Sequence, residues 1–306
     1  MKQPLLLTAV LLLATTASAQ PSAAPYAIDG RGYATLQQAV DAIGAGEGTI
    51  VVSNGRHADC AVQTAGRVTF RGRTGGQAIF DGGACEGKGT LVLRGQGARV
   101  EDLVFENIKV SDGNGAGIRL EAGTLDVART WFRDSQQGIL SGSDAGAVTL
   151  TRSTFTRLGD NNGGPSHSVY FNRIPSLSVT NCRFEEGRGG HYVKSWAART
   201  DVIDNSFDDA KGKWSNYMID LPGGAKGRIA GNAFVQGADK ENHSAFIAVN
   251  AEEKTPERTD LTITKNSATL TPKVPWSTVF VADWGGGKIA LSDNALGKEI
   301  KAFERR

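Results

Sequence analysis

The sequence predicts an all-β solenoid, an elongated domain made of stacked coils. Short apolar runs typical of β-strands follow one another from Thr49 onwards and are separated by Gly, Asn and Asp. In six successive segments a Phe closes such a run, at a spacing of about 25 residues, which is a repeat length typical of solenoids. Because one such repeat cannot bury its apolar face alone, neighbouring repeats must stack. The six residues are Phe105, Phe132, Phe155, Phe184, Phe207 and Phe234.

The first residues have the pattern of a cleavable export signal. Lys2 precedes an apolar run over 5–14, and small residues at 17–19 stand ahead of Gln20. The apolar run is too short to span a bilayer. We therefore expect residues 1–19 to be a signal peptide, residues 20–306 to form a single domain, and the protein to be periplasmic or secreted without a membrane anchor.

The overall charge is close to balanced. The chain has 34 Lys and Arg residues against 32 Asp and Glu residues. A protein that binds nucleic acid usually carries a basic excess or a basic stripe, so we expect no such partner. The 39 Gly and only 9 Pro residues suit many tight turns between short strands. We also expect a monomer.

A single helix is predicted near the N-terminus, over about 35–43. Thr35 and Gln38 form a capping box, and Gly44 is a natural stop. The apolar side chains between them fall on one helical face. We expect this helix to cap the open end of the strand stack, where exposed strand edges would invite aggregation.

The coils themselves are expected over about 49–297. Two residues before each Phe stands a side chain that is mostly small or polar, and the later coils repeat an Asn there. Asn tolerates the left-handed backbone region and forms hydrogen bonds along stacked turns, so we assign this series a structural role. The four asparagines are Asn205, Asn232, Asn266 and Asn294.

Three cysteines are present. In an oxidising compartment, Cys60 and Cys85 can form a disulfide, and two buried thiols are the equal alternative. Cys182 belongs to an apolar strand pattern with nothing nearby to lower its pKa, so we expect it to be structural.

The chain resembles the right-handed parallel β-helix proteins of the pectate-lyase-like superfamily over about 34–300. The resemblance is carried by the segment ATLQQAVDAIGAGEGTIVVSNGRH at 34–57 and by the V-x-x-x-N-x-F pattern of the coils. It implies a right-handed parallel β-helix. Lyases, hydrolases, epimerases and binding proteins share this fold, so the fold does not decide the function.

The stretch from 165 to 222 concentrates the reactive side chains. Successive side chains of a strand point to opposite faces, so if Val169 and its equivalents point inward, the residues next to them point outward. Equivalent residues of adjacent coils lie about 4.8 Å apart. One outward column is therefore expected to hold Tyr170, Lys194 and Asp220. The same alternation predicts a parallel outward column of Ser168, Tyr192 and Met218. Strict alternation would turn His167, His191 and Tyr217 inward, but Gly and Pro residues indicate turns just before these strands, so we expect the three residues at the rim of the face.

This set suits β-elimination on a uronic-acid polymer. That reaction needs a base for the C5 proton, positive charge or hydrogen bonds for the resulting anion, and an acid for the leaving oxygen. Lys194 or a His can serve as base, Tyr170 as acid, and Arg199 or Lys194 as the group that neutralises the substrate carboxylate. Trp196 can stack on a sugar ring or cover a coil edge.

The same stretch resembles the alginate-lyase-type branch of the superfamily. Lys194 and Ser195, followed by Asn205-Ser206-Phe207, match the K-S and N-x-F elements of a coil in which the Lys serves as base. In that branch an Arg from the following coil serves as acid, and here Asp220 stands in that coil. The resemblance therefore implies the base but not the acid, for which Tyr170, His167 and His191 are the candidates.

No acidic calcium cluster of that branch is evident. Asp160, Asn161 and Asn162 offer oxygen ligands, but such a run is also typical of a turn. A bound Ca²⁺ is the one cofactor left open.

We expect an exported polysaccharide lyase with an acidic polysaccharide as its substrate. The candidate catalytic residues are Lys194, Tyr170, His167 and His191, and the candidate substrate-binding residues are Arg199, Tyr192, Trp196, Tyr217 and Asp220. The alternatives are a uronate C5-epimerase, which shares the first step, and a non-catalytic glycan-binding β-helix protein. Inverting hydrolysis needs paired carboxylates, and Asp220 has no outward partner in the pattern. The charged segment 251–276 is expected to be an inserted loop beside the groove.

Overall fold

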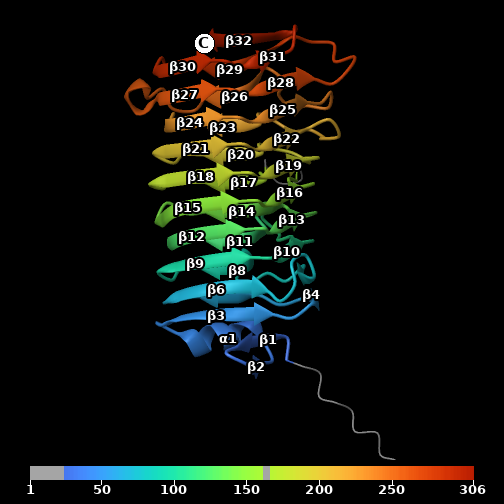
Figure 1. Ribbon diagram of the computed structural model, residues 1–306, viewed down its shortest axis with the longest axis vertical. Helices are drawn as coiled ribbons and strands as arrows, with labels where there is room; N and C mark the ends of the chain where they lie inside the picture. The colour runs from blue at the N-terminus through green and yellow to red at the C-terminus, as the bar shows by residue number, and fades with distance from the viewer. Residues whose placement is uncertain (1–23, 161–165) are drawn as a thin grey trace, which may run out of the picture.

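The computed structural model describes residues 24–160 and 166–306, which form a parallel β-solenoid (Figure 1). The expected signal peptide, residues 1–19, lies outside the described residues. Each coil contributes one strand to each of three sheets that run the length of the stack. The all-β solenoid expected from the repeats is confirmed.

Sheet A has twelve strands in the described residues; its second strand pairs antiparallel with both of its neighbours, and the remaining pairs are parallel. Its order is β2 (Arg31–Tyr33), β1 (Tyr26–Ile28), β3 (Glu47–Val52), β6 (Arg67–Gly72), β9 (Gly97–Glu101), β12 (Gly123–Ala128), β15 (Ala145–Thr151), β18 (Ser176–Thr180), β21 (Arg199–Ile203), β24 (Lys226–Ala230), β27 (Asp260–Thr264) and β30 (Lys288–Ser292).

Sheets B and C have ten strands each over the same residues. Sheet B contains β4 (Gly55–His57), β7 (Ala78–Asp81), β10 (Leu103–Glu106), β13 (Trp131–Arg133), β16 (Thr154–Thr156), β19 (Arg183–Glu185), β22 (Ser206–Asp208), β25 (Ala233–Gln236), β28 (Ser267–Leu270) and β31 (Ala295–Leu296). Sheet C contains β5 (Ala61–Gln63), β8 (Gly89–Leu93), β11 (Ala116–Leu120), β14 (Gln137–Ser141), β17 (Val169–Phe171), β20 (Val193–Ser195), β23 (Ile219–Leu221), β26 (Ala245–Val249), β29 (Thr278–Asp283) and β32 (Ile300–Arg305).

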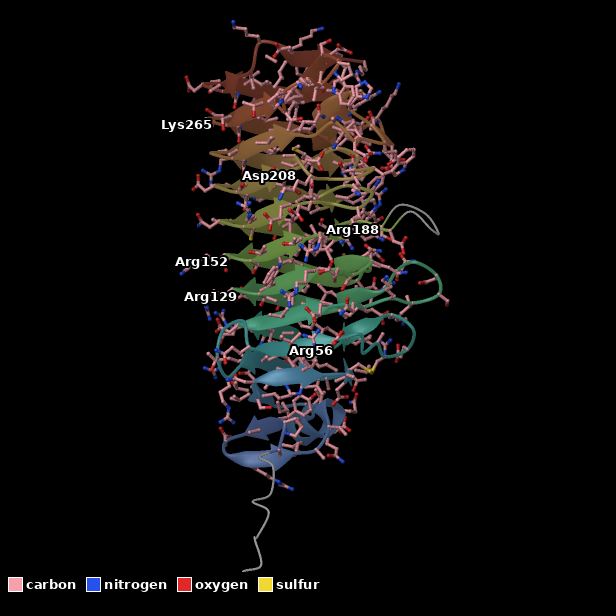
Figure 2. The ribbon with its side chains drawn as sticks, turned by 90° about the vertical axis from the view of Figure 1, so that its right-hand side faces the viewer. Arg56, Arg129, Arg152, Arg188, Asp208 and Lys265 are labelled. Atoms are coloured by element: carbon pink, nitrogen blue, oxygen red, sulfur yellow. A yellow bond between two sulfur atoms is a disulfide. The ribbon has the colours of Figure 1, made fainter. Side chains whose placement is uncertain are left out.

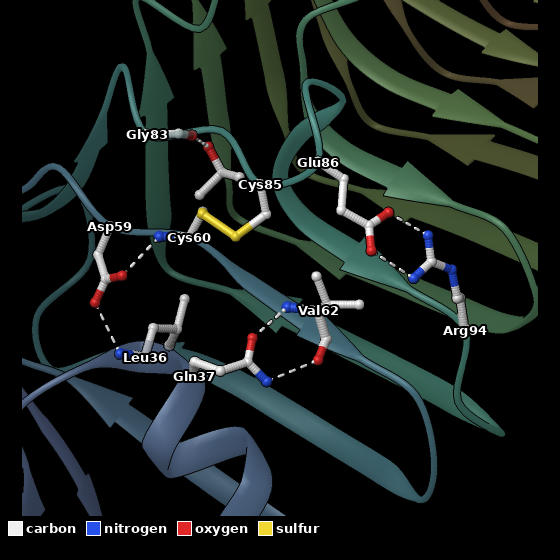
Figure 3. The surroundings of a disulfide bond; sticks show 10 residues. Leu36, Gln37, Asp59, Cys60, Val62, Gly83, Cys85, Glu86 and Arg94 are labelled. Atoms are coloured by element: carbon white, nitrogen blue, oxygen red, sulfur yellow. Dashed lines mark hydrogen bonds and ion pairs between the residues drawn. A yellow bond between two sulfur atoms is a disulfide. The ribbon is translucent and has the colours of Figure 1, made fainter.

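A helix is present where the capping box predicts one, as α1 (Leu36–Ile43) at the N-terminal end of the stack (Figure 1). The Thr35 side chain accepts a hydrogen bond from the Gln38 N–H, as the capping box requires. The Gln37 amide pairs with both backbone groups of Val62 on β5, at 2.8 and 3.0 Å (Figure 3). With its eight residues, α1 is too short to span a bilayer. The described part of the chain contains no helix with the length and apolar character that a membrane span needs.

A disulfide joins Cys60 and Cys85, so the alternative of two buried thiols is wrong (Figure 3). The bond links the segment before β5 to the segment before β8. Both of these strands belong to sheet C. The disulfide therefore ties together two neighbouring coils at the N-terminal end of that sheet.

The interior of the stack is filled by ladders of identical residues. Seven Phe rings, from Phe80 to Phe234, stack with centroids 4.7–5.4 Å apart. The asparagines expected to be structural bond to one another along the stack, with each amide 2.9 Å from the next carbonyl oxygen. Cys182 lies at the start of this ladder, and burial raises the pKa of its thiol to about 11. The structural role assigned to Cys182 is thus consistent with its surroundings.

From β9 onwards, each coil turns sharply between sheets A and B through one residue in the left-handed region. Arg129, Arg152 and Lys265 occupy this corner with φ of 50°, 46° and 57°, and they project along one edge of the stack (Figure 2). Their side chains lie outside the solenoid, so any residue tolerant of this backbone suffices. This explains why the position before the Asn ladder varies in sequence.

Candidate active site

The outward column expected from strand alternation is present on sheet C. Tyr170 of β17 lies opposite Lys194 of β20, and Lys194 lies opposite Asp220 of β23. Val169 and its equivalents in the next two coils are fully buried on the inner side. Period-two alternation and a regular coil spacing together bring an amine, a phenol and a carboxylate to one face.

Lys194 lies between two carboxylates. Its Nζ is 3.1 Å from Asp220 Oδ2 and also contacts Glu252 Oε1. The two carboxylates differ in exposure, since the Asp220 side chain is 3% exposed and the Glu252 side chain 50%. Burial lowers the pKa of Lys194, but the charges of Asp220 and Glu252 outweigh it, and the pKa is raised. In this arrangement Lys194 is an ammonium ion.

Asp220 is the buried end of the column. Its Oδ2 is 3.3 Å from His191 Nε2, and its Oδ1 has no hydrogen-bond partner among the described residues. Burial raises the pKa of Asp220, and the nearby Lys194 ammonium opposes this shift. Asp220 can therefore accept a proton more readily than an exposed carboxylate.

The three residues expected at the rim form a stacked ladder beside the column. The His167 and His191 rings are 5.1 Å apart, and the His191 and Tyr217 rings 5.6 Å apart. The Tyr170 ring packs against His167 at 5.7 Å. All three ladder side chains are largely buried, so they are less accessible than a rim position implies. The Tyr217 hydroxyl also accepts a hydrogen bond from the Asn242 amide at 2.8 Å.

The protonation state of His167 follows from a backbone contact. The His191 N–H donates to His167 Nδ1 at 3.0 Å, which leaves the ring proton on Nε2. Burial lowers the pKa of His167 well below its usual range, and the charges of His191 and Lys194 lower it further. His167 is thus a neutral hydrogen-bond donor at its second nitrogen.

Gly190 makes room for this contact. Its φ is 58°, and a Cβ at this position would lie 2.1 Å from the Ser166 carbonyl oxygen and 2.6 Å from His167 Nδ1. A side chain here would clash with the backbone and the imidazole together. Glycine at 190 is therefore required for the His167 position.

A polar cleft of about 340 Å³ opens beside the column. Arg119 of β11 lies in the same column as Tyr170, two coils earlier, with Leu140 between them. The Arg119 guanidinium lies 3.6 Å from Glu121 Oε1, and the Gln137 amide donates a hydrogen bond to Asn114 Oδ1 at 2.9 Å. The cleft is thus lined by polar and charged side chains that suit a polar ligand. Its lining residues include Asn114, Arg119, Gln137, His167, Tyr170 and Asn172.

The loop after β26 covers the other end of the column. Glu252 reaches Lys194, and Glu253 pairs with Arg173, whose guanidinium lies 4.9 Å above the Trp196 ring. The expected insertion at 251–276 is a loop only over 251–259, which includes a short 3₁₀ turn, and over 271–276. The rest contains β27 and β28, which are ordinary coil strands because LTITKNSATL keeps the repeat pattern.

Two expected substrate-binding residues lie elsewhere. Tyr192 was expected to face outward, and this is wrong: its ring is buried edge-on against Phe184 and Phe207, and its hydroxyl donates to Asp209 Oδ1 at 2.6 Å. Strand alternation does not apply to Tyr192, because β20 begins only at the next residue. Arg199 begins β21 on sheet A, and its guanidinium pairs with Asp201 at 2.8 Å.

The rest of that second column also turns inward. Met218 is fully buried in the core, and Ser168 is 2% exposed. Both residues immediately precede a sheet C strand, as Tyr192 does. The corner before each strand therefore places two successive side chains inside, which alternation alone does not predict.

The candidate calcium ligands receive no support from their surroundings. Asn161 and Asn162 lie outside the described residues. Asp160 accepts a hydrogen bond from Gln136 and lines a cleft with basic side chains, whose charges oppose a cation. Among the described residues, no group of three His, Cys, Asp or Glu side chains is arranged to hold a metal ion. The basic residues of this cleft are Lys109, Arg157, Arg188 and Lys213.

Comparison with known proteins supports the fold alone. No protein-family model matches the sequence, and no curated protein does. ORF18 of Geobacillus virus E2 is similar in structure, with a TM-score of 0.56 and 13% identity over 90% of this chain and 58% of that chain. An alginate lyase of the PL6 family (TM-score 0.32, 15% identity) is matched over 88% of this chain and 52% of the lyase. A GH87 α-1,3-glucanase from Streptomyces thermodiastaticus (TM-score 0.31, 13% identity) is matched over 88% and 67%. The chain thus spans between about half and two thirds of the length of these proteins, and its likeness to the viral protein is one of fold alone.

Proposed function

We propose that this protein is an exported lyase that cleaves a uronic-acid polysaccharide by β-elimination. The observation that carries the proposal is the pairing of Tyr170 with Lys194 on one face of sheet C. The cleft beside them adds the Arg119 guanidinium and the neutral His167. A phenol, an amine and convergent donors suit a substrate that carries a carboxylate next to an acidic C–H bond.

The proposed base is Lys194 in its neutral form. The Lys194 ammonium must first lose a proton, and the proposed acceptor is the buried Asp220, which lies 3.1 Å away and has a raised pKa. The neutral amine then removes the C5 proton of the uronate, and the electron pair moves into the sugar ring and expels the 4-linked oxygen. Transfer from Lys194 to Asp220 costs less once a bound sugar excludes water, because burial disfavours both charges.

Tyr170 is the proposed acid. Burial raises the pKa of its phenol, although the Lys194 charge opposes the shift, so the hydroxyl keeps its proton at neutral pH. It can donate that proton to the departing glycosidic oxygen. Arg119 and the Nε2–H of His167 are proposed to bind substrate oxygens in the adjoining cleft.

The test is a screen of purified protein on alginate, pectate and glucuronan, with and without Ca²⁺. β-Elimination creates a C4–C5 double bond conjugated with the carboxylate, so ultraviolet absorbance must rise with at least one polymer. No absorbance change on any of them would contradict the lyase proposal. Product analysis by NMR separates the lyase from a C5-epimerase, which would invert C5 without cleaving the chain.

A non-catalytic glycan-binding protein is the second candidate. Lys194 is paired with two carboxylates, and this state lacks a free base. A protein that only binds acidic glycans would need no more than such a fixed cation. Binding of a polymer that is recovered unchanged after long incubation would favour this function.

Export and end capping are also proposals. The Cys60–Cys85 disulfide supports an oxidising compartment, such as the periplasm or the extracellular space, and agrees with the signal pattern at 1–19. The pairing of Gln37 with the edge of β5 supports a capping role for α1, because this contact satisfies backbone groups at the end of sheet C.

A further inference from the structure

The contact between Glu252 and Lys194 differs in kind from the contact between Asp220 and Lys194. Asp220 is buried within the column and belongs to a strand of sheet C. Glu252 belongs to a surface loop, and its side chain is half exposed. In the described part of the chain Lys194 is the one side-chain partner of Glu252. The Asp220 carboxylate is thus part of the buried site, whereas the Glu252 carboxylate contacts the site from its surface.

We infer that the Glu252 carboxylate occupies the subsite that receives a carboxylate of an acidic glycan, and that the ligand displaces it. This inference rests on the proposed function, since it assigns a subsite of the same groove. The ligand class follows from the contact itself, because a carboxylate is what Lys194 holds there now.

The position of the cleft supports this assignment. The open cleft runs along the column from Arg119 to Tyr170 and ends there, one coil before Lys194. Glu252 covers the Lys194 ammonium at that end. Movement of Glu252 would extend the cleft by one coil, about 4.8 Å along the stack, to the proposed base.

The loop is attached in a way that permits this displacement. Backbone N–H groups of Glu252 and Glu253 both donate to the Pro222 carbonyl, at 3.1 and 2.8 Å, and the Thr255 hydroxyl donates to the Gly223 carbonyl. These contacts hold the loop backbone, not the Glu252 carboxylate. Because the Glu252 side chain is half exposed, water already solvates its carboxylate, and a ligand carboxylate can replace it at little cost.

The exchange would also act on the proposed base. Glu252 is one of the two charges that raise the pKa of Lys194. Asp220 of β23 faces the amine from the next coil, His191 lies in the same coil as Lys194, and Tyr170 of β17 faces the amine from the preceding coil. Those groups stay in place when Glu252 moves away. Displacement of Glu252 by a ligand therefore changes only one of the carboxylates that act on the pKa of Lys194.

The test compares Glu252→Gln with wild type and with Glu257→Gln. Glu257 lies in the 3₁₀ turn Pro256–Arg258 of the same loop, and its side chain is exposed. Calorimetric titration would use trimers of galacturonate and of mannuronate, with their methyl esters as neutral controls. Glu252→Gln should bind the free acids about fivefold more tightly, should bind the esters unchanged, and the Glu257→Gln control should match wild type. Equal or weaker binding of the acids by Glu252→Gln would overturn the inference and leave the proposed function standing.

A second readout does not require a glycan. The rate at which an amine-reactive ester acylates Lys194, followed by peptide mass spectrometry, should rise severalfold in Glu252→Gln and stay unchanged in Glu257→Gln. An unchanged rate in Glu252→Gln would mean that Glu252 does not cover the amine, and the inference would be wrong. A raised rate with no uronate bound by any of the three proteins would overturn the proposed function, and the ligand class inferred here with it.

Discussion

The backbone N–H of His191 donates a hydrogen bond to Nδ1 of His167 at 3.0 Å, from one coil to the one before it. This contact fixes the His167 tautomer and opposes a second ring proton, because a protonated Nδ1 would face the N–H of His191. It also couples the solenoid register to the chemistry of the site. A displacement of one coil against the next would alter the protonation state of a residue that lines the cleft.

His167 should make the folded state less stable in mild acid. Its folded-state pKa is depressed by burial and by nearby positive charge, whereas an unfolded His titrates near a pKa of about 6.5. The stability it contributes is therefore fully present above that pH and is lost as the pH falls below it. His167→Asn keeps an acceptor for the His191 N–H but cannot titrate. Urea unfolding from about pH 7 to about pH 5 should show a smaller loss of stability in this variant. An identical pH profile in both proteins would contradict the assigned state of His167.

The pair Lys194 and Asp220 should behave as a buried unit. Lys194→Met leaves the buried Asp220 carboxylate beside His191 but without its ammonium partner. This substitution should lower the free energy of unfolding by about 3–5 kcal/mol. The double variant Lys194→Met with Asp220→Asn removes both charges and should be more stable than Lys194→Met. Urea titrations at neutral pH measure both differences. Strictly additive effects of the two substitutions would show that the pair is not coupled.

Gly190→Ala should disturb the site through the backbone. The positive φ and the clash with the Ser166 carbonyl predict a loss of about 1–3 kcal/mol in unfolding free energy. A matched control is Gly142→Ala, because a Cβ there meets no atom closer than 3.8 Å. The NMR signals of His167 should shift in the first variant alone. Equal stability of the two variants would argue against the close approach at Gly190.

Loss of the Cys60–Cys85 bond should weaken the N-terminal coils. The bond closes a loop with a sequence separation of 25 residues, which predicts a stabilisation of about 3 kcal/mol. A variant with both cysteines replaced by Ala should melt at a lower temperature, and hydrogen exchange should rise first in β5 and β8. Cys182→Ala serves as a control because Cys182 is unpaired and distant in the stack. Uniform exchange along the whole stack would contradict this local role.

The part of the site that lies on regular strands could be predicted from sequence. Tyr170, Lys194 and Asp220 were found because period-two alternation and the coil spacing hold within β17, β20 and β23. Arg119 was missed, although the same spacing counted two coils back leads to it through Leu140.

Corners and loops could not be predicted in this way. Tyr192 lies one residue before a strand, where the chain turns and both it and the next residue face inward. Glu252 reaches Lys194 from 58 residues away, through a loop whose path no periodic pattern specifies. Long-range ion pairs of this kind depend on the folded loop and leave no signal in the local sequence.

The central claim is that Lys194 and Tyr170 together perform β-elimination on an acidic polysaccharide. The most direct measurement is the initial rate of ultraviolet absorbance on the polymer that responds best, for wild type, Lys194→Met and Tyr170→Phe. Tyr170→Phe removes only the hydroxyl, and each variant should be slower by about 10²–10⁴-fold, the contribution typical of a general acid or base. Circular dichroism confirms that the variants fold. A wild-type rate in either folded variant, or no absorbance change with wild type on any uronate polymer, would contradict the claim.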